Sequence, residues 1–171
     1  MYDADKVVHE IYKQPEAIAQ IRTLFGETVL SPAGTVDRKA LGKVVFADVA
    51  KLELLTTQVI FPRTDISIKE AIANARSSNA PALVLDAPTL FESGRDRLCD
   101  RIVFVTAPIA RRQEWARKRG WESGDLERRE SRMASEEVKR RRADIVIDNA
   151  GSLEETGRIA GEVFENWVLA R

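Results

Sequence analysis

Carboxylates stand at two places in this sequence where they could hold a metal ion or take a proton from a hydroxyl. Asp86 directly follows the apolar run Ala82-Leu83-Val84-Leu85. An aspartate at the end of a strand can hold Mg²⁺, usually through water. Asp86 could equally cap the turn that follows it.

The second place is the amino terminus, where Asp3-Ala4-Asp5 precedes a helical pattern. A carboxylate in this position could act as a general base towards a hydroxyl substrate. The alternative is structural, with Asp5 as the N-cap of the helix.

The segment from Arg111 to Arg142 is strongly basic. It contains twelve Lys or Arg residues against seven Asp or Glu residues, although the whole chain has 27 of each and a formal net charge of +0. A local excess of arginine suits a multiply charged anion such as a nucleoside triphosphate. It is also compatible with a solvated helical hairpin stabilised by ion pairs within its helices.

Composition excludes several other classes of protein. With only Cys99 and His9, the chain has no internal disulfide and no thiolate zinc cluster. The balanced charge disfavours a nucleic-acid partner. No stretch approaches the roughly 18 apolar residues of a membrane span, so we expect a cytoplasmic protein with no membrane partner.

The first half of the chain shows helical patterns. We expect helices over 5–12 and 15–25, a helix N-capped by Asp37, and another over about 50–60 that Pro62 ends before a longer helix starts at about Asp65. The three tryptophans are expected to pack in the core; they are Trp115, Trp121 and Trp167.

The second half alternates strand and helix patterns. Continuous apolar runs at 82–85, 102–106 and 145–147 predict strands buried on both faces, and the helical segments between them indicate a parallel sheet with crossover helices. Ligands of such sheets bind at the carboxyl ends of the strands. Asp86, Ala107-Pro108 and Asp148-Asn149-Ala150-Gly151 lie at those ends.

Five blocks, taken in order, resemble the dephospho-coenzyme A kinase family over nearly the whole chain. The blocks are Asp3-Ala4-Asp5, the segment 34–46, Leu85-Asp86-Ala87-Pro88-Thr89-Leu90-Phe91-Glu92, the segment 99–105, and the segment 139–149. The resemblance implies transfer of the γ-phosphoryl group of ATP to the ribose 3′-hydroxyl of dephospho-coenzyme A, the last step of coenzyme A synthesis. It implies ATP and dephospho-coenzyme A as small-molecule partners, with Mg²⁺.

The fold implied is α/β, with the three-layer parallel sheet of P-loop kinases in a single domain over residues 1–171. A helical acceptor-binding part would cover about 34–80 and a basic lid about 111–135.

The resemblance also assigns the site residues. Asp5, with Asp3 beside it, would be the catalytic base; Asp86, Leu90, Phe91 and Glu92 would bind the acceptor; Arg112, Arg117, Arg119 and Arg132 would bind phosphate; Asn149 and Gly151 would lie against the nucleotide base. Direct metal ligands are not expected, although Asp86 could hold Mg²⁺ through water.

The sequence departs from the family pattern at three points. Family members begin with a strand, a G-x-x-x-x-G-K-[ST] loop and a helix, roughly 30 residues that this sequence lacks. We therefore expect the chain as written to be inactive on its own. Phe61 precedes Pro62 where the family usually has histidine, and Trp115 stands at or beside the position of a lid arginine.

Other functions remain open from the sequence. The chain could be a non-catalytic remnant or partner protein that binds coenzyme A or a nucleotide. A nucleic-acid role for the basic segment is a more distant alternative.

Overall fold

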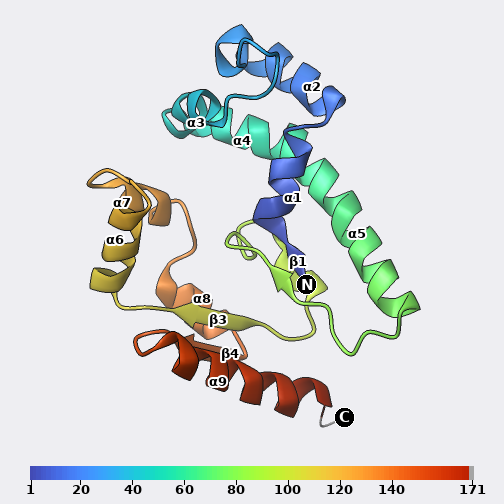
Figure 1. The fold of residues 1–171 in the computed structure, drawn as a ribbon, viewed down its shortest axis with the longest axis vertical. Coiled ribbons are helices and arrows are strands. Elements are labelled where there is room, and N and C mark those ends of the chain that lie inside the picture. The colour runs from blue at the N-terminus through green and yellow to red at the C-terminus, as the bar shows by residue number, and fades with distance from the viewer. Residues whose placement is uncertain (170–171) are drawn as a thin grey trace. The chain divides into compact units, whose positions relative to one another are not determined.

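The computed structural model describes residues 1–169. Its fold divides into two compact units, Met1–Ala87 and Pro88–Arg171 (Figure 1). The described strands of each unit form one two-stranded parallel sheet, with helices between the strands in the sequence. The predicted α/β class with parallel strands is confirmed.

The first unit is mostly helical. Its elements are β1 (Tyr2–Asp3), α1 (Ala4–Ile11), α2 (Pro15–Phe25), η1 (Glu27–Val29), α3 (Arg38–Phe46), α4 (Val49–Leu55), η2 (Thr56–Ile60), α5 (Phe61–Ser77) and β2 (Leu85–Asp86). As predicted, Asp37 caps a helix, accepting from the backbone N–H groups of Lys39 and Ala40 at 2.9 and 3.0 Å. Gly26 ends α2 with φ of +84°, a left-handed conformation that favours glycine.

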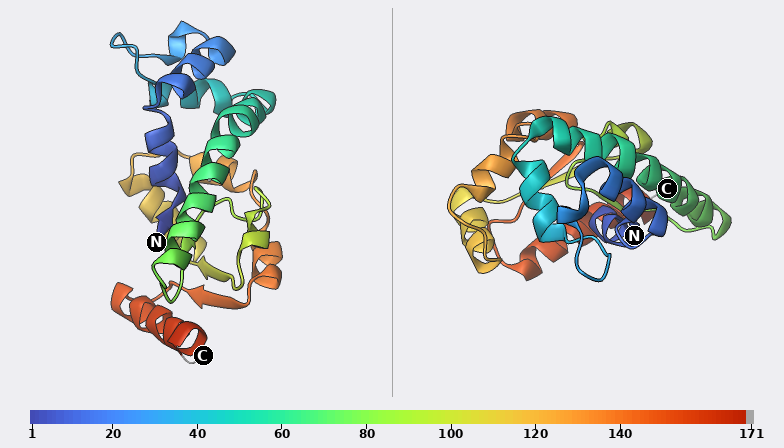
Figure 2. Two further views of the ribbon diagram at one scale, coloured as in Figure 1. Left: turned by 90° about the vertical axis from the view of Figure 1, so that its right-hand side faces the viewer. Right: turned by 90° about the horizontal axis from the view of Figure 1, so that it is seen from above.

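The hydrophobic core of this unit holds its helices together. Its fully or nearly fully buried members are Ile11, Ala17, Ile21, Val29, Leu41, Val45, Leu55 and Val59. They come from α1, α2, η1, α3, α4 and η2, so most helices of the unit contribute a side chain. Helix α1 also runs beside α5 (Figure 2), which fixes the helix that follows Asp3.

Pro62 does not end a helix, contrary to the sequence prediction. The backbone stays helical from α4 through η2 into α5, and η2 is a π-helical turn in which Phe61 N–H bonds the carbonyl of Thr56, five residues back. A proline inside a helix lacks an N–H group and clashes with the preceding turn. The wider π turn, with one extra residue, accommodates it within a continuous run.

Gln20 of α2 stabilises this π turn from outside. Because Pro62 cannot donate, the carbonyl of Gln58 has no α-helical partner, and the side-chain Nε2 of Gln20 donates to it at 3.1 Å. Arg63 in turn donates to the Oε1 of Gln20 at 3.0 Å and to the carbonyl of Val59 at 3.0 Å. Gln20 therefore bonds the Gln58 carbonyl directly and positions Arg63, which bonds the Val59 carbonyl.

The second unit alternates strands and helices. Its elements are η3 (Arg95–Leu98), β3 (Val103–Thr106), α6 (Ile109–Lys118), α7 (Asp125–Glu130), α8 (Glu136–Arg142), β4 (Ile145–Asp148), α9 (Leu153–Phe164) and η4 (Glu165–Leu169). Strands β3 and β4 pair in parallel from Val103 opposite Ile145 to Thr106 opposite Asp148.

The strands differ from the sequence prediction in extent and burial. The predicted strand over 82–85 is reduced to Leu85–Asp86, and its partner β1 was not predicted because two residues show no periodicity. Val103 and Val105 of β3 are 39% and 52% exposed, so this strand is not buried on both faces. In a two-stranded sheet, few neighbouring side chains are available to cover both faces.

The lengths and polarity of the helices show whether any of them could cross a membrane. Within residues 1–169, every helix is too short or too polar to span a bilayer.

Replacing Gln20 by leucine tests the role of this side chain at the π turn. Gln20→Leu removes the donor to the Gln58 carbonyl, which lies in an exposed position, so we expect the free energy of unfolding to fall by about 1 kcal/mol. The measurement is chemical denaturation. The matched control is Gln14→Leu, because Gln14 makes no side-chain capping bond at the start of α2; its effect should stay within about 0.5 kcal/mol. Equal losses in the two variants would contradict the proposed support.

Candidate active site

Two of the predicted site residues, Asp3 and Asp86, lie opposite one another on adjacent strands. In the parallel pairing of β1 and β2, Tyr2 is opposite Leu85 and Asp3 opposite Asp86. Each aspartate is the last residue of its strand. Parallel pairing therefore brings carboxylates more than 80 residues apart in the sequence to the same end of one sheet, as expected for a ligand-binding edge.

The two amino-terminal aspartates have different surroundings. Asp3, and not Asp5 as one interpretation of the sequence had it, is the N-cap of α1 and accepts from Lys6 N–H at 3.0 Å. This hydrogen bond, with the Lys6 ammonium 3.1 Å away, lowers the pKa of the Asp3 carboxyl. Asp5 is exposed in the first turn of α1. Among residues 1–169, its carboxylate has no hydrogen-bond or ion-pair partner.

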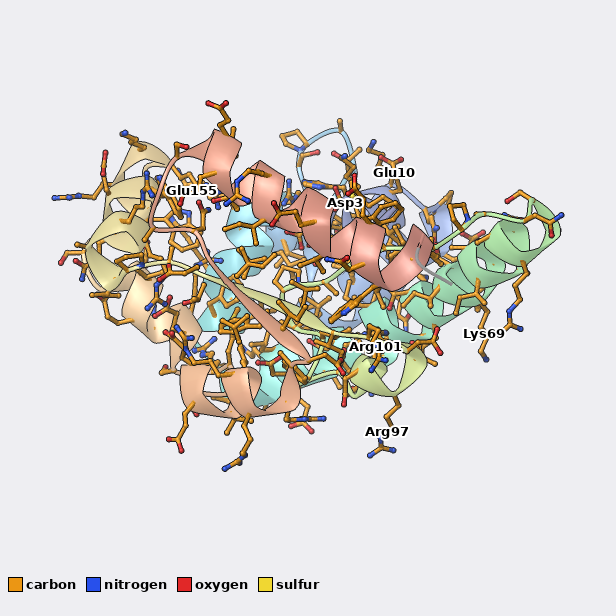
Figure 3. All side chains as sticks on the ribbon, turned by 90° about the horizontal axis from the view of Figure 1, so that it is seen from below. Asp3, Glu10, Lys69, Arg97, Arg101 and Glu155 are labelled. Carbon is orange, nitrogen blue, oxygen red and sulfur yellow. The ribbon has the colours of Figure 1, made fainter. Side chains whose placement is uncertain are left out.

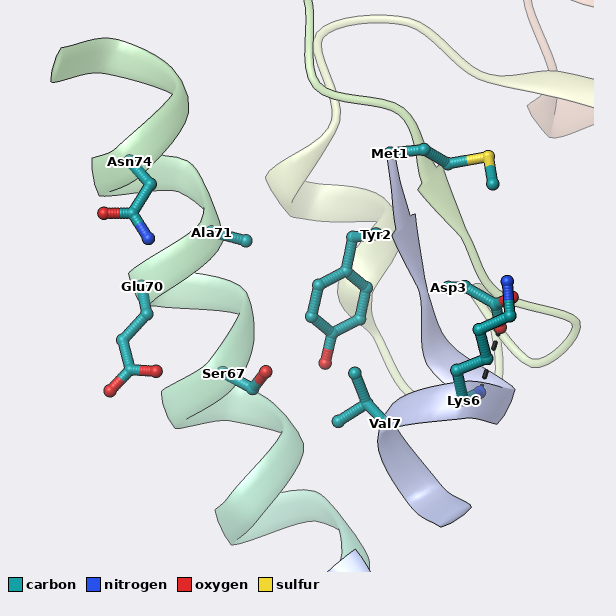
Figure 4. A pocket seen from close by; sticks show the side chains of 9 residues that line it. All are labelled: Met1, Tyr2, Asp3, Lys6, Val7, Ser67, Glu70, Ala71 and Asn74. Carbon is teal, nitrogen blue, oxygen red and sulfur yellow. Dashed lines mark hydrogen bonds and ion pairs between the residues drawn. The ribbon is translucent and has the colours of Figure 1, made fainter. Parts of the chain in front are cut away.

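A pocket of about 370 Å³ opens beside Asp3 (Figure 4). Tyr2 lies between β1 and α5, and its hydroxyl donates to the Thr64 carbonyl of α5 at 3.4 Å. The pocket is lined by Met1 and by residues of β1, α1 and α5: Tyr2, Asp3, Lys6, Val7, Ser67, Glu70, Ala71 and Asn74. The α5 residues were not predicted as site residues, although Ser67, Glu70 and Asn74 recur at the spacing of one helix face.

In the second unit, the predicted acceptor segment contacts α8 and the loop before it. Glu92 Oε1 accepts from Ala134 N–H at 2.6 Å, and the ammonium of Lys139 lies 3.8 Å away. The guanidinium of Arg142 lies over the ring of Phe91, 4.6 Å from its centroid. Leu90 is half-buried and its carbonyl accepts from Arg95 N–H. These contacts connect the segment 90–92 to α8 and to Ala134, at the end of the predicted lid.

Most arginines of the basic segment with described contacts pair with carboxylates. Arg112, predicted to bind phosphate, contacts Glu130 and Glu136, and its Nε is buried without a partner within residues 1–169. Pairs within helices also occur, as the hairpin alternative predicted: Lys118 with Glu114, Arg128 with Asp125, and Arg140 with Glu136. Of the other predicted phosphate ligands, Arg117 and Arg119 are exposed on or just after α6, and Arg132 follows α7.

Glu136 is the centre of this network. It accepts from Arg140 Nε at 2.9 Å and from the Thr106 hydroxyl at 3.0 Å, with Arg112 3.6 Å away. The hydrogen bond from Arg140 is the largest of the effects that lower the pKa of Glu136. Because Thr106 ends β3, Glu136 connects that strand to α6 and α8.

The predicted base-binding residues lie in the loop after β4. Asn149 N–H donates to the Thr106 carbonyl at 2.7 Å, and its Oδ1 accepts from the Thr156 hydroxyl at 2.9 Å. A side chain at Gly151 would meet the carboxylate of Glu155, which lies in the first turn of α9. The end of the flexible Glu155 side chain can move aside, so this approach alone does not require glycine at position 151.

Arg111, which was not predicted as a site residue, also contacts this loop. Its Nη1 donates to the carbonyls of Asn149, Ala150 and Gly151. The available signal was the composition of the basic segment, which does not distinguish Arg111 from Arg112. Only the fold shows which of two consecutive arginines faces the loop.

The tryptophans do not form a buried core, contrary to the prediction. Each is half-buried beneath a guanidinium: Arg111 lies 5.5 Å from the centroid of Trp115, Arg129 lies 4.2 Å from that of Trp121, and Arg101, labelled in Figure 3, lies 5.7 Å from that of Trp167. In a segment rich in arginine, cation–π contact uses both the apolar body of the cation and the face of the ring.

A sequence model described as dephospho-CoA kinase matches residues 1–155. This chain belongs to the dephospho-CoA kinase family. The relative of that name from Aquifex aeolicus is 34% identical over 167 residues, which is 95% of this chain and 82% of the relative. The one from Corynebacterium glutamicum is 34% identical over 172 residues, which is 99% of this chain and 84% of the relative.

Two solved structures are similar to this chain. The crystal structure of TT1252 from Thermus thermophilus superposes with a TM-score of 0.78 at 30% identity, covering 97% of this chain and 83% of that one. Dephospho-CoA kinase from Campylobacter jejuni has a TM-score of 0.68 at 21% identity, covering 99% and 85%, a likeness of fold. The family and the P-loop-kinase-like fold predicted from the five blocks are confirmed, as is the prediction that the protein is a kinase.

The carboxylates of this dephospho-CoA kinase family member fit Mg²⁺ only as partners of a nucleotide. Residues 1–169 contain no cluster of three or more acidic, cysteine or histidine side chains that could enclose a metal ion. Mg²⁺ in kinase sites is held by one or two carboxylates together with substrate phosphates and water. Asp3 and Asp86 at one sheet edge fit that limited role.

The Glu136 network predicts a pH-dependent contribution to stability. A carboxyl whose pKa is lowered on folding stabilises the fold above its unfolded pKa, and this contribution is lost as pH falls through the lower, folded pKa. We expect Glu136→Gln to reduce the free energy of unfolding at neutral pH by about 1 kcal/mol or less, because the side chain is partly exposed. The difference from the unsubstituted chain should shrink below the ordinary glutamate value of 4.5.

Urea denaturation at neutral and acidic pH measures this difference. Glu137→Gln is the control, since Glu137 is the exposed neighbour in the same helical turn. A Glu136→Gln effect that stays constant through the acidic range would show that charge is not its source.

Proposed function

We propose that this protein carries the acceptor, lid and base-binding parts of a dephospho-CoA kinase, and that the 171 residues alone do not complete the reaction. The reaction is transfer of the γ-phosphoryl group of ATP to the ribose 3′-hydroxyl of dephospho-CoA. Support for the site comes chiefly from the register of β1 and β2, which places Asp3 and Asp86 at one sheet edge, and from the position of Asp5 in the first turn of α1.

Asp5 is the better candidate for the general base. The Asp3 carboxylate already accepts the capping hydrogen bond of α1, and its lowered pKa makes it a weaker base. The Asp5 carboxylate is exposed, and a hydroxyl substrate can approach it. In the proposed step, Asp5 takes the proton of the 3′-hydroxyl while the ribose oxygen bonds to the γ-phosphorus. The bond from that phosphorus to the β–γ bridging oxygen breaks, and ADP leaves.

The basic segment would neutralise charge on the transferred group. Arginines stabilise phosphoryl transfer because the guanidinium donates two parallel hydrogen bonds to phosphate oxygens. Arg112, Arg117, Arg119 and Arg132 remain our candidates for this task. Mg²⁺, when bound with the nucleotide, would neutralise part of the phosphate charge.

The proposal of inactivity rests on what the 171 residues do not contain. They hold no G-x-x-x-x-G-K-[ST] sequence; the one Gly-Lys pair, Gly42-Lys43, lies inside α3. Without that loop, the reaction loses the backbone N–H groups and the lysine that bind the β- and γ-phosphates. A second candidate function follows from this absence: a binding protein that retains the acceptor site without turnover.

Adding the loop tests both candidate functions. We expect the 171-residue chain to produce no coenzyme A from ATP and dephospho-CoA, measured by chromatography of the product. A fusion that carries the strand, P-loop and helix of a family member ahead of Met1 should produce it. The control fusion has the loop lysine replaced by alanine. Turnover by the unfused chain would refute inactivity, and an inactive but folded fusion that still binds dephospho-CoA would favour the binding protein.

The same fusion tests the proposed base. Asp5→Asn removes the proton acceptor while keeping nearly the same shape, so we expect kcat to fall by about 10²–10⁴-fold. Asp3→Asn should cost less, because asparagine caps a helix about as well as aspartate. Glu10→Gln, an exposed substitution on the same helix, is the control. A larger loss from Asp3→Asn than from Asp5→Asn would reverse the assignment of roles.

A further inference from the structure

Arg112 of α6 is held by two carboxylates from later helices of the second unit. Its Nη1 donates to Glu130, the last residue of α7, and its Nη2 lies 3.6 Å from Glu136 at the start of α8. The side chain of Arg112 is 29% exposed. The protein itself therefore supplies the anions that neutralise this cation.

The two carboxylates differ in how firmly they are held. Glu136 also accepts from Arg140 at 2.9 Å and from the Thr106 hydroxyl at 3.0 Å. Within residues 1–169, Arg112 is the one hydrogen-bond or ion-pair partner of the Glu130 carboxylate. If Arg112 moves, Glu136 keeps two donors and Glu130 keeps none. Glu130 is therefore the carboxylate that an external anion can replace at Arg112.

Arg112 also carries a donor that neither glutamate uses. Its Nε is buried and has no acceptor among residues 1–169. A buried donor without a partner costs free energy. A phosphate group has enough acceptor oxygens to take two N–H groups of one guanidinium at once. Because Nε is buried, the guanidinium must turn before an anion can reach this atom, and the bond to Glu130 opposes that turn.

The position of this network is suited to a ligand. Thr106 is the last residue of β3, and its hydroxyl bonds Glu136, the carboxylate beside Arg112. The network therefore lies at the carboxyl end of β3, where parallel sheets bind their ligands. Figure 1 shows α6, α7 and α8 following β3 along the chain and leading to β4.

We propose that Glu130 is an internal competitor for phosphate at Arg112, an inference that rests on the proposed function. The Glu130 carboxylate holds the guanidinium until a phosphate group displaces it, so Glu130 lowers the affinity of the basic segment for phosphate. A residue that served only to stabilise the fold would not oppose ligand binding. Removal of the Glu130 charge should therefore strengthen phosphate binding even though it removes an ion pair from the fold.

The test is a titration of the 171-residue chain with inorganic pyrophosphate at fixed ionic strength, followed by phosphorus NMR. Pyrophosphate presents the two linked phosphate groups that the end of ATP also presents. Glu130→Gln keeps the shape of the side chain and removes its charge. We expect this variant to bind pyrophosphate about two- to fivefold more tightly, because a partly exposed ion pair no longer has to be broken.

Glu127→Gln is the matched control for charge. It removes the same charge from the same helix, but the Glu127 carboxylate bonds the neutral side chain of Gln113 at 3.0 Å and not an arginine. At physiological ionic strength, we expect its affinity to change by less than about 1.5-fold. Equal gains from the two substitutions would show that overall charge is responsible, and would overturn the role of Glu130.

A second measurement ties the effect to Arg112. In an Arg112→Leu background, Glu130→Gln should no longer improve binding, because the two substitutions act on one contact. Where Arg112→Leu does not fold, as judged by circular dichroism, proton–nitrogen NMR of the Arg112 Nε–H group replaces it. That signal is assigned by its absence from Arg112→Lys. Pyrophosphate should shift it, and at lower concentration in Glu130→Gln.

The outcomes distinguish this inference from the proposed function. Pyrophosphate binding that Glu130→Gln leaves unchanged or weakens, or a gain that persists without Arg112, would overturn competition by Glu130 and leave the proposed kinase function intact. No pyrophosphate binding by any variant, at concentrations where dephospho-CoA binds, would overturn both the inference and the phosphate-binding role proposed for Arg112. The proposed transfer reaction is judged separately, by the activity of the fusion that carries the P-loop.

Discussion

Parallel strand pairing is the constraint on which the chemistry of this protein depends. Parallel strands point their carboxyl ends the same way, so residues just after two paired strands meet even when the sequence separates them widely. In the first unit this rule brings Asp3 to Asp86. In the second, it sets Thr106 opposite Asp148, and the following Asn149 bonds back to the Thr106 carbonyl. Each pair of strands therefore brings together one group of candidate site residues.

The helical part of the first unit accommodates a proline inside a continuous helical run. Proline would normally end the helix at Phe61-Pro62, yet the π turn of η2 keeps the run helical. Because Pro62 has no N–H group, the carbonyl of Gln58 needs a hydrogen-bond donor from another element, and Gln20 of α2 supplies it. The core residues Leu55 and Val59, which lie either side of the turn's start, thereby remain in the core.

Sequence reasoning succeeded where the cause of the structure is local or where a motif is long. Asp37 as a cap and Gly26 as a helix end follow from the conformations of single residues. The family followed from five blocks in order, and the model match over residues 1–155 confirms it. These inferences require no knowledge of which segments meet in space.

The sequence could not show how the arginines are divided among partners. Arg111 and Arg112 are neighbours of one type, but adjacent positions on a helix face different directions. One faces a loop nearly 40 residues later, and the other faces Glu130 and Glu136. The tryptophans were misassigned for the same reason, since stacking beneath an arginine depends on distance in space.

The ion pairs within the basic segment determine which arginines are available for the proposed phosphoryl transfer. Arg112 is already shared between two carboxylates, so its charge is largely neutralised in this structure, while its buried Nε has no acceptor among the residues that the structure describes. A phosphate group presents more charge and more acceptor oxygens than one carboxylate. If Arg112 binds phosphate as proposed, it must leave at least one glutamate and gain an acceptor for Nε in the same movement. Glu136, still held by Arg140 and Thr106, would keep its place while Arg112 moves.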